Sequence, residues 1–338
     1  MSRSGPVVCF GEVLLRFATS AGRMIADAAS LDLVIGGAEA NVAVALTGMG
    51  HPARFVGMVP DNPLGAKARG ALAGAGVDVR HFASGPGRMG LYFLETGASL
   101  RPSSITYDRA GSAFAMAQAA DFDFAEALDG ARLFHVSGIT AALGPGGVDL
   151  ARAGMAAARA AGVPVSFDCN FRERLWSAWD SDPRGILTDL IAGADIVFGN
   201  HRDMTLLLGR PFSGDGPERR REAVEAGFAA FPNMQVMAST ARHPLTQTHH
   251  RLAARVDRRD DHHQTAEVEI TDIIDRVGSG DAFAAGVLTG WLEGGDARKM
   301  AELGLAMNAL KHSIHGDWLR LPRAEIDAFT GVGGDVRR

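Results

Sequence analysis

The sequence predicts an α/β fold in which a mostly parallel central sheet is covered by helices on both faces and carries a small β lid. After residue 110, short apolar runs alternate with longer helical patterns, as in βαβ units. Polar residues directly follow these runs, where the carboxyl ends of parallel strands would form a binding crevice. Between residues 81 and 109 the apolar spacing changes to an alternating one, which predicts the lid.

Composition and charge limit the classes of protein. The 338 residues are enough for one large domain or two smaller ones, and an apolar content of 46% is enough for a sizeable core. A net charge of −5 gives no indication of a nucleic-acid or anionic-membrane partner. Cys9 and Cys169 lie in apolar runs and are expected to be reduced. With neither a signal-peptide pattern nor an apolar run of membrane-spanning length, a cytoplasmic protein is expected.

The first half of the chain is predicted to alternate short strands and helices before the lid insertion. Strands are expected at residues 7–12, 14–18, 31–35 and 54–59, and helices after residue 37 and at 62–74. Residues 81–109 are expected to form an antiparallel insertion. Residues 85–90 match the dinucleotide pattern G-x-G-x-x-G, but they precede a strand and open no helix, so nucleotide binding there is rejected. The expected catalytic domain comprises residues 1–12, 36–80 and 110–330, and the expected lid comprises residues 13–35 and 81–109.

The second half continues the alternation. Strands are expected at residues 132–136, 163–167, 194–198, 234–238 and 266–274, and helices at 146–161, 282–292 and 297–312. Five histidines between residues 242 and 264 lack the spacing of a zinc site, so this segment is expected to be a solvated loop. The tail at residues 331–338 is expected to be disordered.

The most informative stretch is D-R-V-G-S-G-D at residues 275–281, hereafter the anion loop. Gly278, Ser279 and Gly280 lie between a β-rich run and a helix, so their backbone N–H groups can point at an anion at the positive end of that helix. Asp281 has two interpretations on this stretch alone. It is either an ordinary helix cap or a group that accepts a proton beside a bound anion.

The polar residues at other strand ends suit phosphoryl transfer, which needs positioned phosphates, Mg²⁺ and a base. Asn200 and Asp203 could bind Mg²⁺ through water. Arg109 and Arg172 could hold a carboxylate, although an exposed strand arginine and a partner of Glu173 are the simpler alternatives. The chain lacks the P-loop signature, the protein-kinase loops and a G-x-S-x-G elbow.

Two motifs together resemble those of the PfkB-type, ribokinase-like carbohydrate kinases. G-G-A-E-A-N-V-A at residues 36–43 is similar to the N-terminal signature of that family. The anion loop resembles its C-terminal signature, usually written D-T-x-G-A-G-D, and the two occur in the family's order. The resemblance implies a ribokinase-like three-layer α/β/α sandwich with a β lid, and ATP-dependent phosphorylation of a sugar hydroxyl.

The resemblance also implies roles for individual residues. Asp281 would be the general base, and the backbone of Gly278, Ser279 and Gly280 would form the anion hole. Sugar contacts are implied for Gly37 and Asn41, with Ile139 added from its place after a strand end. Nucleotide contacts are expected from Asn200, Ser239, Arg242, Gly278, Gly280, Asn308 and His312, and Mg²⁺ contacts through water from Asn200 and Asp203.

Within the family, four stretches are most similar to 2-keto-3-deoxygluconate kinases. These are residues 37–41, 105–113, 168–172 and 309–317. The resemblance implies that an acid sugar is held by Tyr107, Arg109 and Arg172, with Tyr92 a further lid candidate and Asp317 near the base. Tyr92 and Tyr107 have a simpler interpretation as sheet-face aromatics. A kinase of a neutral sugar and a non-catalytic binding regulator remain as alternatives.

The sequence departs from the family pattern at three places. Asp203 replaces the usual Glu, and Arg276 replaces Thr, so a monovalent-cation site of the ribokinase kind is not expected. The usual G-x-x-G after the nucleotide-side strand is absent, and residues 239–242 stand in its place. An apolar lid face formed by Leu91, Phe93 and Ile105 predicts a homodimer through the lids.

Overall fold

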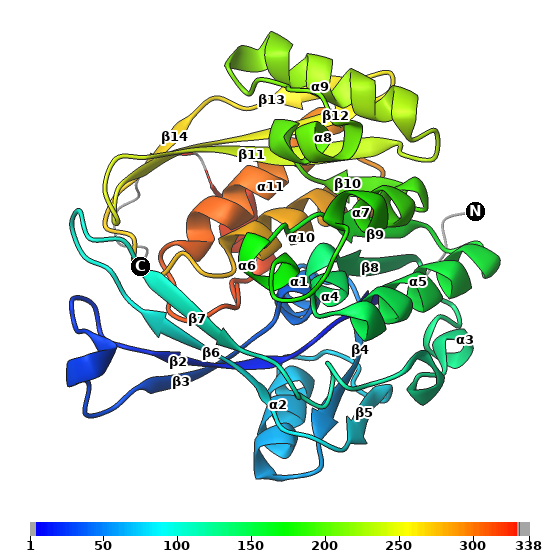
Figure 1. Ribbon diagram of the computed structural model, residues 1–338. Helices are drawn as coiled ribbons and strands as arrows, with labels where there is room; N and C mark the ends of the chain where they lie inside the picture. The colour runs from blue at the N-terminus through cyan, green and yellow to red at the C-terminus, as the bar shows by residue number, and fades with distance from the viewer. Residues whose placement is uncertain (1–4, 330, 332–338) are drawn as a thin grey trace.

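The computed structural model describes residues 5–329 and residue 331; the rest of the tail expected at 331–338 lies outside the described residues. Figure 1 shows a large sheet with helices on both sides and a smaller sheet beside one of its edges. The main sheet has 10 strands, nine of them in the order β13-β12-β11-β10-β9-β8-β1-β4-β5, while β14 pairs with β12. The strands of this sheet are β1 (Val7–Phe10), β4 (Ala53–Pro60), β5 (Phe82–Gly85), β8 (Leu133–Ser137), β9 (Val165–Asp168), β10 (Ile196–Phe198), β11 (Val236–Pro244), β12 (His250–Arg258), β13 (His262–Gln264) and β14 (Val268–Ile270).

Two hydrophobic cores, one on each face of the sheet, make the fold a three-layer sandwich. Successive residues of β1 point to opposite faces, so Val7 and Cys9 enter one core while Val8 and Phe10 enter the other. The first core is covered by α1 (Ala38–Gly48), α2 (Pro63–Gly74), α10 (Ser279–Leu292), α11 (Ala297–Lys311) and α12 (Arg323–Asp327). The second is covered by α3 (Phe124–Ala127), α4 (Gly138–Ala142), α5 (Pro145–Ala160), α6 (Glu173–Trp176), α7 (Pro183–Ala192), α8 (His201–Leu208) and α9 (Gly216–Ala230). Among the described residues, no helix combines the length and apolar character needed to cross a membrane.

The register of the parallel strands aligns their carboxyl ends. Ser137 of β8 and Phe198 of β10 both pair with Asp168 of β9, and Phe198 also pairs with Ala238 of β11. The polar residues that follow these strands therefore lie along one edge of the sheet, as the alternation predicted.

The lid is a four-stranded sheet in the order β3-β2-β6-β7. Its strands are β2 (Leu14–Ala18), β3 (Asp32–Gly36), β6 (Gly90–Glu95) and β7 (Ser104–Asp108). Within the expected insertion β6 and β7 pair antiparallel, as predicted, while β2 pairs with β6 in parallel. One expectation about the lid is wrong. Residues 82–85 do not belong to the lid, because β5 pairs with β4 of the main sheet.

The prediction that Leu91, Phe93 and Ile105 share one apolar face of the lid is wrong for Ile105. Ile105 pairs directly with Leu94, one residue away from Phe93, and so lies on the face of Tyr92 and Tyr107. Leu91 and Phe93 point to the other face, where Phe93 stacks on Phe17 with ring centroids 5.5 Å apart. The face on which Ile105 lies depends on the register between β6 and β7, which the sequence alone does not show.

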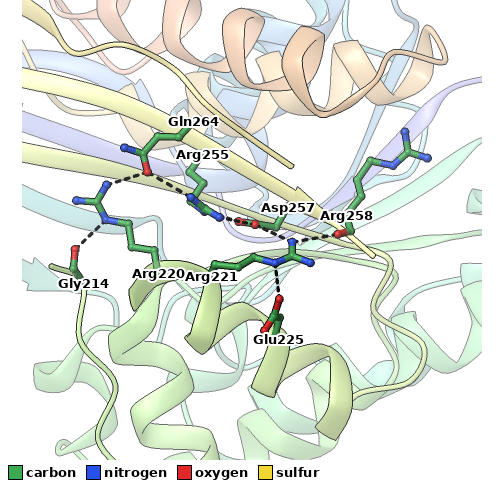
Figure 2. Close-up of polar contacts among 8 residues, drawn as sticks. All are labelled: Gly214, Arg220, Arg221, Glu225, Arg255, Asp257, Arg258 and Gln264. Carbon is green, nitrogen blue, oxygen red and sulfur yellow. Dashed lines mark hydrogen bonds and ion pairs between the residues drawn. The ribbon is translucent and has the colours of Figure 1, made fainter. Parts of the chain in front are cut away.

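The segment expected to be a solvated loop contains the buried strand β12. This strand pairs with β11, which continues to Pro244, so residues 239–242 lie inside a strand and not after one. The prediction is wrong because the charged side chains of this segment, which were expected to face solvent, are paired within the protein. Arg255 donates from Nε and Nη2 to the carboxylate of Asp257 at 2.6 and 2.7 Å, and Arg221 of α9 donates to the same carboxylate at 3.0 Å (Figure 2). Both Arg255 and Asp257 are buried.

Candidate active site

An open cavity of about 910 Å³ lies between the lid and the carboxyl edge of the main sheet. Every residue predicted for the site lines it: Gly37, Asn41, Tyr92, Tyr107, Arg109, Ile139, Arg172, Asn200, Asp203, Ser239, Arg242, Gly278, Ser279, Gly280, Asp281, Asn308, His312 and Asp317. The structure thus brings together residues from both halves of the chain, and their individual roles remain predictions.

The anion loop ends at the N-terminus of α10. Gly278 is left-handed with a φ of 81°, and no side chain caps this helix. A Cβ atom on Gly278 would lie 1.9 Å from the backbone oxygen of Asp317, so the loop packs against Asp317 only with glycine here. A Cβ on Gly280 would meet nothing within 4 Å, so the backbone there faces open space. No side chain therefore competes with an anion for the N–H groups of this first turn, and the N–H of Ser279 also donates to the backbone oxygen of Arg276 at 3.2 Å.

Asp281 lies in the first turn of α10, beside Asn41 of α1. Asn41 Nδ2 donates a hydrogen bond of 2.6 Å to Asp281 Oδ2. Burial raises the pKa of Asp281 to about 6, while the Asn41 hydrogen bond acts to lower it. A carboxylate with this pKa can accept a proton near neutral pH. The buried Oδ1 of Asn41 has no hydrogen-bond partner among the described residues, so it is available to a bound hydroxyl.

Two further carboxyl groups line the cavity, and the sequence predicted a role in the reaction for neither. Burial raises the pKa of both Asp168 and Glu39 to about 7, and the charge of Asp281 acts in the same direction on each. Ser137 donates a hydrogen bond of 2.5 Å to Glu39. The sequence does indicate that Asp168 faces the cavity, because this residue stands at the carboxyl end of β9, level with the other strand ends.

The two arginines expected to hold an acid substrate differ in the structure. Arg172 is exposed in the cavity, and no ion pair of its side chain is present in the described part of the chain. Arg109 is buried, and its Nε and Nη2 lie 2.7 and 2.6 Å from Oε2 of Glu12, a residue that was not predicted. The charge of Arg109 is therefore balanced inside the protein although the residue lines the cavity, and its contact with an acid substrate stays a prediction.

A buried network joins the lid to the anion loop. Arg16 of β2 lies 2.5 Å from Oδ2 of Asp275 through Nη2 and 2.9 Å from Oδ1 of Asp317 through Nη1. Tyr92 of β6 donates a hydrogen bond of 2.5 Å to the other oxygen of Asp317. Burial raises the pKa of Asp317, and the Arg16 charge opposes this effect. The sequence gives no signal for the role of Arg16, because its partner Asp275 lies 259 residues away along the chain.

The opposite end of the cavity carries cations and unpaired acceptors. Arg242 and Arg276 both line it; partial desolvation lowers the pKa of Arg242, and the charge of Arg276 adds to that effect. Asn308 Nδ2 donates to the backbone oxygen of Ser279 at 3.0 Å, while its Oδ1 and Nε2 of His312 have no hydrogen-bond partner in the described structure. Two adjacent guanidinium groups favour a polyanion, and the unpaired buried atoms favour a hydrogen-bonding ligand.

Asn200 and Asp203 form a capping box at the start of α8. Asn200 Oδ1 accepts from the backbone N–H of Arg202 at 2.8 Å, and Asp203 Oδ2 accepts from the backbone N–H of Asn200 at 2.7 Å. Within residues 5–329 and 331, no three His, Cys, Asp or Glu side chains gather closely enough to hold a metal ion. A cation here would need oxygens from a ligand as well as from the protein.

Comparison with known proteins agrees with this geometry. The model of the pfkB family carbohydrate kinases matches residues 5–317. A 2-dehydro-3-deoxygalactonokinase of Haloferax volcanii is 31% identical over 98% of this chain and 98% of its own length. A crystal structure of 2-dehydro-3-deoxygluconokinase from Thermotoga maritima has a TM-score of 0.90 at 39% identity, covering 95% of this chain and 98% of that one. A probable chloroplastic fructokinase of Arabidopsis thaliana is 28% identical over 84% of this chain and 69% of its own length. The predicted ribokinase-like fold class is confirmed, and the chain belongs to the pfkB family of carbohydrate kinases.

Proposed function

We propose that this kinase transfers the γ-phosphoryl group of ATP to the terminal hydroxyl of 2-keto-3-deoxygluconate (2-dehydro-3-deoxygluconate), giving the 6-phosphate. One observation supports an acid sugar as the substrate: Arg172 is exposed in the cavity and has no ion pair in the described structure. A sugar carboxylate can pair directly with this guanidinium, whereas a neutral sugar cannot. The names of the Haloferax and Thermotoga relatives support the same class of substrate.

The reaction follows from the two ends of the anion loop. The carboxylate of Asp281 accepts the proton of the terminal hydroxyl, and that oxygen forms a bond to the γ-phosphorus. The bond between the γ-phosphorus and its bridging oxygen breaks at the same time, and ADP leaves with the electron pair. The backbone N–H groups of Gly278, Ser279 and Gly280 stabilise the charge on the transferring group, since no side chain competes for them at the helix N-terminus.

The nucleotide is proposed to lie along Arg242 and Arg276, with Ser239 beside the phosphates and Asn308 and His312 near the base. Their unpaired acceptors and guanidinium groups suit a purine and a triphosphate.

Magnesium fits the residues present only as a companion of the nucleotide. Mg²⁺ is usually held by one or two carboxylates together with substrate phosphates and waters. Asn200 and Asp203 can provide such oxygens at the cavity wall, through bridging water. When bound, Mg²⁺ neutralises phosphate charge. The protein's own part is to fix Asp203 through the capping box, so that its carboxylate does not have to be ordered on binding.

Two further properties are proposed. Both cysteines are free and buried, which suits a reducing, cytoplasmic location. The outer face of the lid carries Phe17, Phe93 and Leu33, the last of them 39% exposed, and this apolar face would be covered in a homodimer.

A kinase for a neutral sugar such as fructose is the second candidate. One observation favours it: the charge of Arg109 is already balanced by Glu12, which makes this arginine less available to a sugar carboxylate. The similarity to a probable fructokinase agrees with this alternative. A non-catalytic regulator has no comparable support, because the anion loop and Asp281 are both present in the cavity.

The test is ADP release measured with a panel of acid and neutral sugars. Turnover is expected with 2-keto-3-deoxygluconate or its galactonate epimer and not with fructose or ribose. Arg172→Ala should raise KM for the acid sugar by roughly 10- to 100-fold, since a charge-assisted contact contributes about 1.5–3 kcal/mol. Arg152→Ala, which removes an exposed arginine paired with Asp189, is the matched control and should leave KM unchanged. Turnover on fructose alone would establish the second candidate.

A further inference from the structure

One buried cation near the site is not used by the proposed reaction. Lys311, at the end of α11, is 0% exposed. Lysine is rare in this chain, whose 34 Lys and Arg residues include only Lys67, Lys299 and Lys311. Its Nζ donates to the backbone oxygen of Ile314 at 2.9 Å and to the backbone oxygen of Asp275 at 3.2 Å. Burying an ammonium group is costly unless nearby oxygens compensate for the lost water, so its position calls for a physical explanation.

The two carbonyls belong to segments that together shape the anion loop. Asp275 begins the loop, and its Oδ2 accepts from the backbone N–H of Gly316 at 3.0 Å. The next residue after Gly316 is Asp317, whose backbone oxygen packs against Gly278 so closely that a Cβ there would lie 1.9 Å away. The turn from Lys311 to Asp317 therefore sets where the backbone of Gly278 lies. Lys311 binds both segments, through the backbone oxygen of Asp275 in the loop and that of Ile314 in the turn.

Two backbone oxygens and two nearby carboxylates compensate the charge of Lys311. Burial lowers the pKa of Lys311, but the charges of Asp275 and Asp317 favour the ammonium form. An ammonium ion is a compact point charge that binds several oxygens, as an alkali-metal ion does, whereas a guanidinium is planar and larger. This difference explains why lysine occurs here in a chain that otherwise uses arginine almost everywhere.

We infer that Lys311 is a positioning residue whose tethered ammonium replaces a free monovalent cation at the base of the anion loop. It touches neither sugar nor nucleotide in this assignment; it holds the turn that places Gly278 and thereby the anion hole. The inference rests on the proposed kinase function for its kinetic readout. It predicts that the wild-type enzyme works without potassium or ammonium ions, because the protein carries the cation itself.

The experiment compares Lys311→Ala with wild type in tetramethylammonium, potassium and ammonium chloride at equal ionic strength. Wild-type kcat should agree within about twofold among the salts. Lys311→Ala should lose roughly 10- to 100-fold of kcat in tetramethylammonium, since a displacement of about 1 Å can cost that much. Ammonium or potassium ions should restore at least fivefold of it along a saturable curve (on the order of one cation per site), because they fit the vacated space and tetramethylammonium does not.

Two variants serve as controls. Lys311→Met fills the space of the lysine stem and has no charge, so it should lose kcat and gain nothing from added ions. Lys299→Ala removes a lysine on the same helix that is 43% exposed and pairs with Glu293, and it should behave as wild type in all three salts.

A second readout needs no turnover. Ammonium chloride should raise the thermal midpoint of Lys311→Ala saturably above that in tetramethylammonium chloride, while wild type shows no such difference. Folding of the variant in ammonium but not in tetramethylammonium would give the same support. The inference is overturned if Lys311→Ala keeps wild-type kcat, if no ion improves either readout, or if wild type itself requires an added ion. Absence of wild-type turnover on every sugar would reject the kinase proposal instead, and the thermal readout would still decide on Lys311.

Discussion

At the scale of single residues, the chemistry depends on the protonation of Asp281. Its pKa is raised to about 6 by burial, and only the carboxylate can accept the sugar proton. We therefore expect kcat/KM to rise about tenfold per pH unit below pH 6 and to level off above it. Because the Asn41 hydrogen bond lowers this pKa, Asn41→Ala should move the rising limb to higher pH.

The control for this profile is Asp281→Asn. It should bind ATP normally, lose roughly 10²–10⁴-fold of kcat and show no rising limb near pH 6. A rising limb that persists in this variant would assign the titration to Asp168 or Glu39, which also have raised pKa values.

At the scale of elements, the lid is held to the catalytic domain by a buried ion pair. Arg16→Met removes the ion-pair partner that Asp275 and Asp317 share, so the two buried carboxylates keep only their weaker neighbours. We expect a loss of about 3–5 kcal/mol in the free energy of unfolding, measured from urea midpoints, together with a fall in kcat. Arg101→Met breaks another ion pair of the lid, in which Arg101 is 38% exposed, and should cost less than about 1 kcal/mol. Equal losses for the two variants would contradict a special role of Arg16.

Elements also show which parts of the structure the sequence could predict. The alternation of runs located every strand at the carboxyl edge, because that signal is local. It failed at β12, since Arg255 and Asp257 read as exposed charges although each is the partner of the other. It also missed Arg16 and Glu12, whose partners lie far along the chain. Motifs identified Asp281 and Asn41, but only the folded chain reveals that one orients the other.

At the scale of the whole molecule, the apolar outer face of the lid predicts self-association. Leu33→Glu should weaken the proposed dimer by about 2–4 kcal/mol, roughly 30- to 1,000-fold in Kd, because it places a charge in the contact. Light scattering after size-exclusion chromatography measures the mass directly. Leu64→Glu changes a leucine of α2 with a similar exposure of 43% and should leave the mass unaltered. A wild-type mass of one chain at micromolar concentration would reject the dimer.

The contacts that complete the site also determine at what stage of chain synthesis it can form. Asn41 and Asp281 are 240 residues apart, Tyr92 and Asp317 are 225 apart, and Arg16 and Asp275 are 259 apart. At ribosomal speeds of roughly 5–20 residues per second, Asn41 emerges about 12–48 seconds before the aspartate it orients. The nascent chain therefore spends most of its synthesis without a complete cavity, and a chain that stops before Asp317 lacks the carboxylate that binds Arg16 and Tyr92 of the lid.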